Sequence, residues 1–402
     1  MPSERFRHMP NISILGGDSD HNLGDLAILV ALCQSIVRAS AGSRMTVFAN
    51  NPGVMQYLPP QTTALSRGAS GFARLLGIAP KQDLIVVGGG GLFQDDDSRI
   101  KMPYWAARIA MLRALNRNVV GHALGAGPLE HAESRQCARF ACAAMKSVSV
   151  RDGFAHSWLS RCTDRDVPVV PDPAFMLTPA SEEAARAYVR SIGLNPDRPI
   201  VAVALRRWFH RLGGFVPHRV RSSLGMDKGS GQEEMSALAS DMADALRAVA
   251  RRLDAQIMLM PSYNVAHEGD SRECERLQRH MPDVETRMAV ISDPALYKAV
   301  AGQAKLMISA RMHPLILASS MGVPVVGLAY NGKFEGLFTL LGLQREVLWL
   351  NRFKEGAAKA ADLEQLAADA LNDKTDLRHR AEQLGAVVDR STRELVERTL
   401  AA

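Results

Sequence analysis

The sequence predicts an α/β protein built from two doubly wound, Rossmann-like domains that face one cleft. Three observations support this fold class. The 402 residues, of which 47% are apolar and 22% are charged, are too many for one ordinary hydrophobic core. Short apolar runs alternate with helix-length segments in the first half of the chain. The same alternation begins again after a polar, proline-containing passage over residues 178–199.

In the first half, six short apolar runs are predicted as strands: residues 12–15, 46–49, 83–87, 118–122, 147–151 and 168–170. Helices are predicted over residues 26–40, 104–116 and 132–145. Strands rich in Val and Ile that alternate with helices indicate a parallel sheet that is covered on both faces. We therefore expect residues 1–180 to form an N-terminal α/β domain.

The second series predicts strands over residues 200–205, 256–260, 288–291, 306–308 and 324–328. The helices expected with them are residues 233–252, 268–281, 294–301, 314–321 and 362–371. A second α/β domain is therefore expected over residues 198–350, with helices of residues 351–402 packing across both domains. Residues 209–232 are rich in glycine and basic residues without clear periodicity, which predicts a long loop near the cleft.

Charge and cysteine usage exclude several classes of protein. The net charge is +6, but the 48 basic residues are dispersed among 42 acidic ones, which suits small anions better than nucleic acid. Five cysteines without C-x-x-C spacing indicate neither a disulfide framework nor a zinc site. No signal peptide or membrane-spanning run is apparent. We therefore expect a cytoplasmic protein without a metal or cofactor, with a peripheral position at the inner face of the membrane left open.

Two glycine-containing segments follow predicted strands of the first domain. The first, residues 16–25, ends in Asn22, Gly24 and Asp25, where backbone N–H groups at a helix start favour an anion or a sugar hydroxyl. Asp25 has two interpretations, a substrate contact or the N-cap of a helix from Leu26, which are compatible. The second segment, residues 88–91, includes Gly89, Gly90 and Gly91. Four consecutive glycines favour close approach of a ligand over simple turn formation.

Two single residues at predicted strand ends are further candidates. His122 ends a strand and would reach the cleft, although a lone histidine is more often structural. Arg206 follows the first strand of the second domain, where a guanidinium could bind a carboxylate or a phosphate through two hydrogen bonds. A surface ion pair is the alternative for Arg206.

The strongest single segment is Ser309-Ala310-Arg311-Met312-His313-Pro314. It follows an apolar strand, and Pro314 suits the first residue of the next helix. Arg311, Met312 and His313 would then lie at a strand end and a helix N-terminus together, where a guanidinium, an imidazole and free N–H groups converge. This combination predicts a site for a phosphorylated or carboxylated substrate.

The order and spacing of these segments resemble the polysaccharide pyruvyl transferase family from near residue 12 to near residue 340. The resemblance is carried by Asn22-Leu23-Gly24-Asp25, Gly88-Gly89-Gly90-Gly91-Leu92, Gly125-x-Gly127-Pro128-Leu129, Val150-Arg151-Asp152, Pro171-Asp172-Pro173-Ala174-Phe175, Leu205-Arg206-x-Trp208 and Ser309-x-Arg311-x-His313. The chain departs from the family where its glycine-rich stretch contains Asp18, Ser19, Asp20 and His21, and where His122 stands in place of a frequent glutamine.

The resemblance implies a GT-B-like fold and transfer of pyruvate from phosphoenolpyruvate to two hydroxyls of a sugar, which gives a cyclic ketal. Arg206 and Arg311 would bind the anionic donor, and His313 would protonate its methylene carbon or assist departure of phosphate. Asp25 or His122 would deprotonate the acceptor hydroxyl. The acceptor, which could be lipid-linked or nucleotide-linked, is expected on the first domain.

Two other functions fit the same residues. A GT-B glycosyltransferase would hold a nucleotide sugar against Arg311. A catalytically silent sugar- or phosphate-binding protein would use the same scaffold, but binding alone needs no proton donor such as His313. If the acceptor is lipid-linked, the basic residues 206–221 could assist membrane binding.

Overall fold

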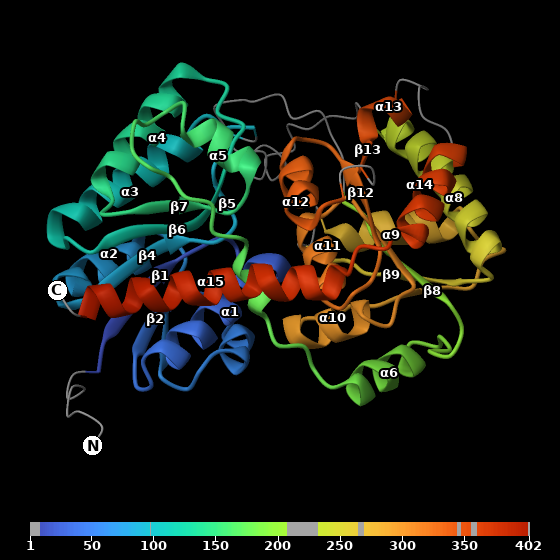
Figure 1. The fold of residues 1–402 in the computed structure, drawn as a ribbon, viewed down its shortest axis with the longest axis horizontal. Helices are drawn as coiled ribbons and strands as arrows, with labels where there is room; N and C mark the ends of the chain where they lie inside the picture. Colours follow the sequence, from blue (N-terminus) through green and yellow to red (C-terminus); the bar gives the residue numbers. More distant parts are fainter. Residues whose placement is uncertain are drawn as a thin grey trace.

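The computed structural model describes residues 9–96, 98–206, 232–263, 269–343, 347–354 and 360–400. Two parallel β-sheets, each enclosed by helices, form two domains that lie beside each other (Figure 1). The predicted α/β class with two doubly wound domains is confirmed. The long loop expected over residues 209–232 lies, up to residue 231, outside the described residues.

The sheet of the first domain has the strand order β3-β2-β1-β4-β6-β5. The seventh strand, β7, also pairs with β6. Every pairing in it is parallel. Its strands are β1 Asn11–Leu15, β2 Arg44–Phe48, β3 Thr62–Leu65, β4 Leu84–Gly88, β5 Gly91–Phe93, β6 Val119–Ala126 and β7 Val148–Val150. Its helices are α1 Leu23–Ala39, η1 Pro52–Tyr57, α2 Ala69–Ile78, η2 Ala79–Lys81, α3 Lys101–Leu115, α4 Ala132–Ala144, α5 Gly153–Leu159 and η3 Pro173–Met176.

Alternate side chains of the central strands supply two separate cores, because successive residues of a strand point to opposite faces of the sheet. Ile12 and Ile14 of β1 pack in a core with α1, whereas Leu15 packs in a second core with α2, α3 and α4. The strands are therefore buried on both faces, which explains their nearly continuous apolar sequences.

The sheet of the second domain has the order β10-β9-β8-β11-β12-β13 and is also parallel throughout. Its strands are β8 Ile200–Ala204, β9 Gln256–Leu259, β10 Thr286–Met288, β11 Leu306–Ser309, β12 Val325–Ala329 and β13 Val347–Trp349. The remaining helices are α6 Glu182–Ser191, α8 Gln232–Leu253, α9 Asp270–Arg279, α10 Pro294–Ala301, α11 Met312–Ser319, α12 Lys333–Leu341, α13 Leu350–Lys354, α14 Ala360–Asn372 and α15 Leu377–Leu400.

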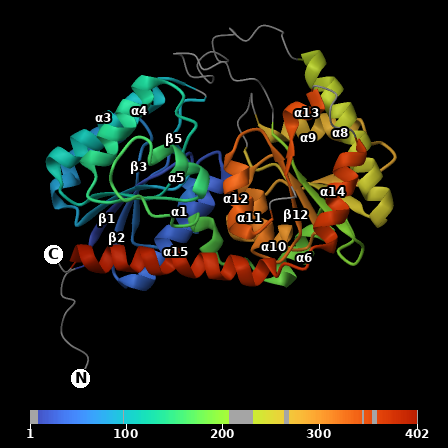
Figure 2. The same ribbon diagram turned by 45° about the horizontal axis from the view of Figure 1, so that its top comes forward.

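The last helix returns to the first domain. Helix α14 packs on α8, whereas α15 runs along both domains and packs on α1 and η3 (Figure 2). Asp389 of α15 accepts hydrogen bonds from Ser35 Oγ at 2.7 Å and Arg38 Nη2 at 2.8 Å. Helix α15, near the C-terminus, is therefore bonded to helix α1, near the N-terminus.

Some predicted elements differ from the structure. The strand expected over residues 168–170 is reduced to one bridge between Val169 and Val150. The strands β3, β5 and β13 and the helices α2, α5, α6 and α12 were not predicted, because these segments are short. None of the helices in the described residues combines the length and the apolar character needed to cross a membrane.

Candidate functional site

The start of helix α11 is the centre of the candidate site. Strand β11 ends at Ser309, and the Ser309 hydroxyl accepts a hydrogen bond from the Arg311 N–H at 2.9 Å, which turns the chain into the helix. Arg311 is the N-cap residue, and its side chain makes no capping hydrogen bond. The N–H groups of Met312 and His313 thus lie at an uncapped positive helix end. The Met312 side chain is buried in the core, so its backbone is the part that can contact a ligand.

The helix begins two residues earlier than predicted. Pro314 is its third residue rather than its first, because Met312 and His313 already have helical conformation. A proline is still compatible with this position, since the N–H groups of the first turn have no partner within the helix.

Arg311 is held by a buried carboxylate. Its Nε and Nη2 atoms donate to the two oxygens of Asp270 at 3.0 and 2.5 Å, and Asp270 is completely buried. Asp270 Oδ2 also accepts from the backbone N–H groups of Ser262 and Tyr263. Burial alone would lower the pKa of Arg311, but the Asp270 carboxylate outweighs it and raises the pKa. The guanidinium is therefore fixed in place, and its charge is already balanced within the protein.

A second group of cations surrounds Tyr330, just after β12. The Arg206 guanidinium lies 4.2 Å from the centre of the Tyr330 ring, and the Lys333 ammonium lies 4.4 Å from it. Lys333 also donates a hydrogen bond to the Tyr330 hydroxyl, and burial lowers the pKa of Lys333. Arg206 and Lys333 therefore form one cationic group, which we call the Tyr330 cluster. Strand β12, which leads to Tyr330, pairs with β11, which leads to Arg311.

Lys333 was missed in the sequence. It is the first residue of α12, in the loop region after the fifth predicted strand of the second domain. The signal that could have found it is this position, since ligands of parallel sheets bind beyond the carboxyl ends of the strands.

His313 lies at the boundary between the two domains. Its Nε2 atom is 3.6 Å from Asp172 Oδ2, which is an ion-pair distance rather than a hydrogen bond. Asp172 also pairs with Arg151 at 3.2 Å. Burial would raise the pKa of Asp172, but the facing His313 and Arg151 side chains outweigh it and lower the pKa. Asp172 thus meets His313 and links it to Arg151, which the sequence alone did not show.

Helix α1 of the first domain contacts His313 directly. A Cβ atom added to Gly24 would lie 2.0 Å from His313 Nδ1, so only glycine fits there. Next to this contact, Leu23 N–H donates to Ser262 O at 2.9 Å, and Asn22 forms a β-bridge with Tyr263. Tyr263 stacks under Arg311 at 5.0 Å. The structure therefore brings Asn22 and Gly24 together with Arg311 and His313.

Asp25 does not cap helix α1, which corrects one of its two sequence interpretations. The helix starts at Leu23, and Asn22 is the N-cap, because its side chain accepts a hydrogen bond from Gly24 N–H at 3.0 Å. Asp25 instead accepts from Asp18 N–H at 2.8 Å and from Asn22 Nδ2 at 3.0 Å. Its carboxylate fixes the loop in front of the helix.

The glycines after β4 are required by the protein's own packing. Gly89 and Gly90 have φ angles of 74° and 79°, which residues other than glycine rarely adopt. A Cβ atom on Gly90 would lie 2.6 Å from Asp25 Oδ1, and one on Gly89 would lie 2.2 Å from Ile28. Gly91 starts strand β5. This turn and the Asp25 loop therefore form one compact surface of the first domain.

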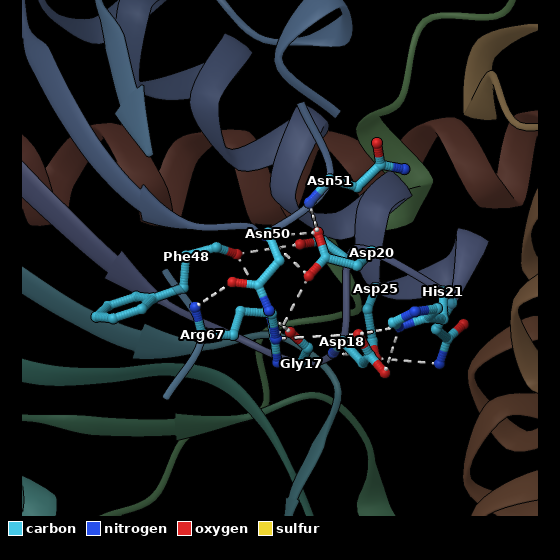
Figure 3. A network of polar contacts seen from close by, with 11 residues as sticks. Gly17, Asp18, Asp20, His21, Asp25, Phe48, Asn50, Asn51 and Arg67 are labelled. Carbon is cyan, nitrogen blue, oxygen red and sulfur yellow. Dashed lines mark hydrogen bonds and ion pairs between the residues drawn. The ribbon is translucent and has the colours of Figure 1, made fainter. Parts of the chain in front are cut away.

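The polar residues that replace the family's glycines are held by a network of contacts (Figure 3). Asp20 accepts hydrogen bonds from the backbone N–H groups of Asn50 and Asn51 at 3.0 to 3.1 Å. Arg67 donates to Gly17 O at 2.6 Å. Figure 3 shows His21 pointing toward Asp18, with Nδ1 at 3.2 Å from the carboxylate. The loop is therefore ordered by its own side chains.

His122 is not placed as predicted. It lies in the middle of β6, is 3% exposed, and its Nε2 is 3.0 Å from the Thr392 hydroxyl of α15. Burial lowers the pKa of His122 to about 4. The strand continues to Ala126 instead of ending at residue 122, so this side chain contacts the C-terminal helix rather than opening toward a ligand.

Two parallel α/β domains with a cationic helix start at their boundary define a protein of GT-B fold. Similar solved structures include UDP-GlcNAc 2-epimerase from Methanocaldococcus jannaschii, with 12% identity and a TM-score of 0.60 over 96% of this chain and 99% of that one. The same enzyme from Neisseria meningitidis, bound to UDP-GlcNAc, has 9% identity and a TM-score of 0.57 over 98% and 100%. Sucrose-phosphate synthase from Thermosynechococcus elongatus has 16% identity and a TM-score of 0.53 over 98% and 100%.

A comparison of the amino-acid sequence with family models identifies the family. A family model described as polysaccharide pyruvyl transferase matches residues 22–332. The chain therefore belongs to the polysaccharide pyruvyl transferase family, as the resemblance of its motifs indicated. No curated protein gives a significant match.

Proposed function

We propose that the protein transfers the pyruvyl group of phosphoenolpyruvate to two hydroxyls of a sugar in a cell-surface polysaccharide or its precursor. Both C–O bonds of a cyclic ketal form at the central carbon of the donor, and its bond to the phosphate oxygen breaks. The two sugar hydroxyls lose one proton each. One proton is gained by the methylene carbon, which becomes a methyl group, and one is gained by the released phosphate.

The observation that carries this proposal is the Tyr330 cluster beside the uncapped start of α11. Phosphoenolpyruvate has a phosphate and a carboxylate, and both are recognised by guanidinium groups and helix N-termini. Asp270 already balances the charge of Arg311. Arg206 and Lys333 place two further cations around Tyr330, and Arg311 supplies fixed N–H groups together with the backbone of Met312 and His313.

His313 is the proposed proton donor. Its Nε2 faces the Asp172 carboxylate, which orients the ring and compensates a positive charge on it. The second ring nitrogen, Nδ1, lies beside Gly24 where the two domains meet. Protonation of the methylene carbon by the His313 imidazole would create a cation-like carbon, which a sugar hydroxyl can attack.

We propose the acceptor side on the first domain, at the loop of Asn22, Gly24 and Asp25 and the turn of residues 89–91. Asp25 is the candidate base for the acceptor hydroxyl, since His122 is buried under α15. The polar loop over residues 18–21 borders this surface and differs from the family pattern. It would therefore influence which sugar is accepted.

A ligand-binding experiment followed by product analysis tests this function. The purified protein is heated with phosphoenolpyruvate or with a nucleoside diphosphate, and the melting temperature is compared. Incubation with phosphoenolpyruvate and a panel of lipid- and nucleotide-linked sugars is then followed by phosphate release and product mass. We expect stabilisation by phosphoenolpyruvate and a product with a ketal-linked pyruvate. Stabilisation by the nucleoside diphosphate alone, with a hexose added to the product, would instead identify a glycosyltransferase.

A further inference from the structure

Helix α3 carries an exposed apolar stripe on the outer side of the first domain. Ile100, Tyr104, Met111 and Leu115 are each between 42% and 48% exposed. Their spacing of four, seven and four residues places them on one face of the helix. The described residues have nine large hydrophobic side chains with comparable exposure, and four of them lie in this stripe. The apolar exposure is therefore concentrated, unlike the scattered single residues that are normal on protein surfaces.

The segments that contain the stripe and the neighbouring helix α2 are strongly basic. Residues 66–82 and 98–129, which contain α2 and α3, include no Asp or Glu. Arg67 and Arg99 in these segments pair with acidic residues of other segments. The same segments also contain Arg74, Lys81, Lys101, Arg108, Arg113 and Arg117.

Helices α2 and α3 pack against each other and form one surface (Figure 1). The Arg108 guanidinium lies 4.3 Å from the Phe72 ring of α2 and 4.2 Å from the Tyr104 ring of α3. Figures 1 and 2 show α3 on the side of the first domain that faces away from the second domain. Docking at this face would therefore leave the boundary between the domains uncovered.

The combination of features indicates one kind of partner. An apolar stripe flanked by basic residues is the pattern of helices that lie in the interface of a bilayer with anionic lipids. Tyrosine is favoured at this depth, since its ring is apolar and its hydroxyl can reach water. Nucleic acid would use the positive charges but not the four apolar side chains.

We propose that the α2–α3 face is a membrane-docking surface for anionic phospholipid bilayers. The stripe would enter the boundary between headgroups and acyl chains, and basic side chains beside it, such as Arg108 on the Tyr104 ring, would contact lipid phosphates. Residues 206–221, which could assist membrane binding if the acceptor is lipid-linked, would then be complemented by this surface in the described part of the chain. This proposal does not depend on pyruvyl transfer, because vesicle binding is measured without donor or acceptor.

Vesicle flotation of the full-length protein tests the proposal. We expect binding to vesicles of equal parts phosphatidylcholine and phosphatidylglycerol, and about tenfold less binding to pure phosphatidylcholine. Met111→Glu combined with Leu115→Glu should lower binding to the anionic vesicles about tenfold, since two charges would enter the headgroup region. Val387→Glu, at a 43% exposed residue of α15, is the matched control and should bind like wild type.

Circular dichroism and light scattering complete the test. All these positions are exposed, so both variants should keep wild-type helix content. Arg113→Gln combined with Arg117→Gln should weaken binding to anionic vesicles while leaving the apolar stripe unchanged. The proposal is overturned if the wild type does not float with anionic vesicles, or if the double glutamate variant floats as well as Val387→Glu. It is also overturned if the stripe variant converts a dimer into a monomer, because a second copy would then be the partner.

Discussion

The imidazole Nε2 of His313 faces the buried carboxylate of Asp172 at 3.6 Å, across the boundary between the two domains. Asp172 also caps the short helix η3 by accepting a hydrogen bond from Ala174 N–H at 3.0 Å. One carboxylate therefore holds a structural element and a catalytic candidate together. Its role in positioning the imidazole can be separated from its role as a cap.

We expect Asp172→Asn to lower kcat by about tenfold or more, because the protonated imidazole loses its compensating charge. As the pH rises, the variant should lose activity at a lower pH than the wild type. Its KM for phosphoenolpyruvate should stay within about twofold of the wild-type value. Asp293→Asn is the matched control, since Asp293 caps α10 in the same way at another place. An unchanged pH–rate profile in Asp172→Asn would leave the residue with the capping role alone.

Gly24→Ala should displace the His313 imidazole. The added Cβ would lie 2.0 Å from His313 Nδ1 and cannot be accommodated without movement of one domain or of the ring. We expect turnover to fall by at least about a hundredfold. Gly77→Ala on α2 is the control, since nothing lies within 4 Å of its added Cβ. Wild-type turnover in Gly24→Ala would show that His313 does not act from this position.

Lys333 is predicted to contribute charge to donor binding. Lys333→Met should raise the Kd of phosphoenolpyruvate about tenfold or more, because a hydrogen bond to a charged group is lost, and Lys333→Arg should restore part of it. Lys374→Met changes an exposed lysine on another part of the surface and should bind like wild type. Calorimetric titration measures all four proteins. Equal Kd values for Lys333→Met and wild type would place the donor away from Tyr330.

The Arg311–Asp270 pair should be essential for folding as well as binding. Asp270→Asn leaves a buried guanidinium without its counter-charge, so we expect a loss of about 3 kcal/mol in the free energy of unfolding. Asp283→Asn removes an exposed carboxylate that also pairs with arginines, and should cost much less, because solvent screens exposed ion pairs. Urea unfolding gives both values. If the two substitutions cost the same, the buried pair contributes no more than a surface pair.

Burial of His122 makes stability depend on pH. Its pKa in the folded protein is about 4, below the ordinary value of 6.5, so the unfolded chain binds more protons between these two values. The free energy of unfolding should fall by about 3 kcal/mol as the pH decreases from 6.5 to 4. His122→Gln should lack this fall, and its kcat at neutral pH should equal that of wild type. Melting curves across this pH range and phosphate release measure the two effects. A variant that is stable but inactive would return His122 to the list of catalytic candidates.

The sequence by itself determined most of the framework. Apolar strands at regular spacing predicted both sheets, and the strand ends predicted Arg206, Arg311 and His313 as one group of candidates. These features are local, since hydrophobic period and strand length are encoded in a few neighbouring residues. The strands β3, β5 and β13 were missed because each has only three or four residues, too few for an apolar pattern to be recognised.

Only the tertiary structure decided which side chains meet. Asp270 binds Arg311, and Asp172 faces His313, although neither partner is near in sequence. His122 is covered by Thr392, 270 residues later in the chain, which removed it from the candidates at the acceptor side. Lys333 joins Arg206 on Tyr330 because β8 and β12 flank β11 in the sheet, an order that the sequence pattern does not show. Contacts of this kind depend on how domains and distant helices pack, so their charges and burial could be assigned only from the folded chain.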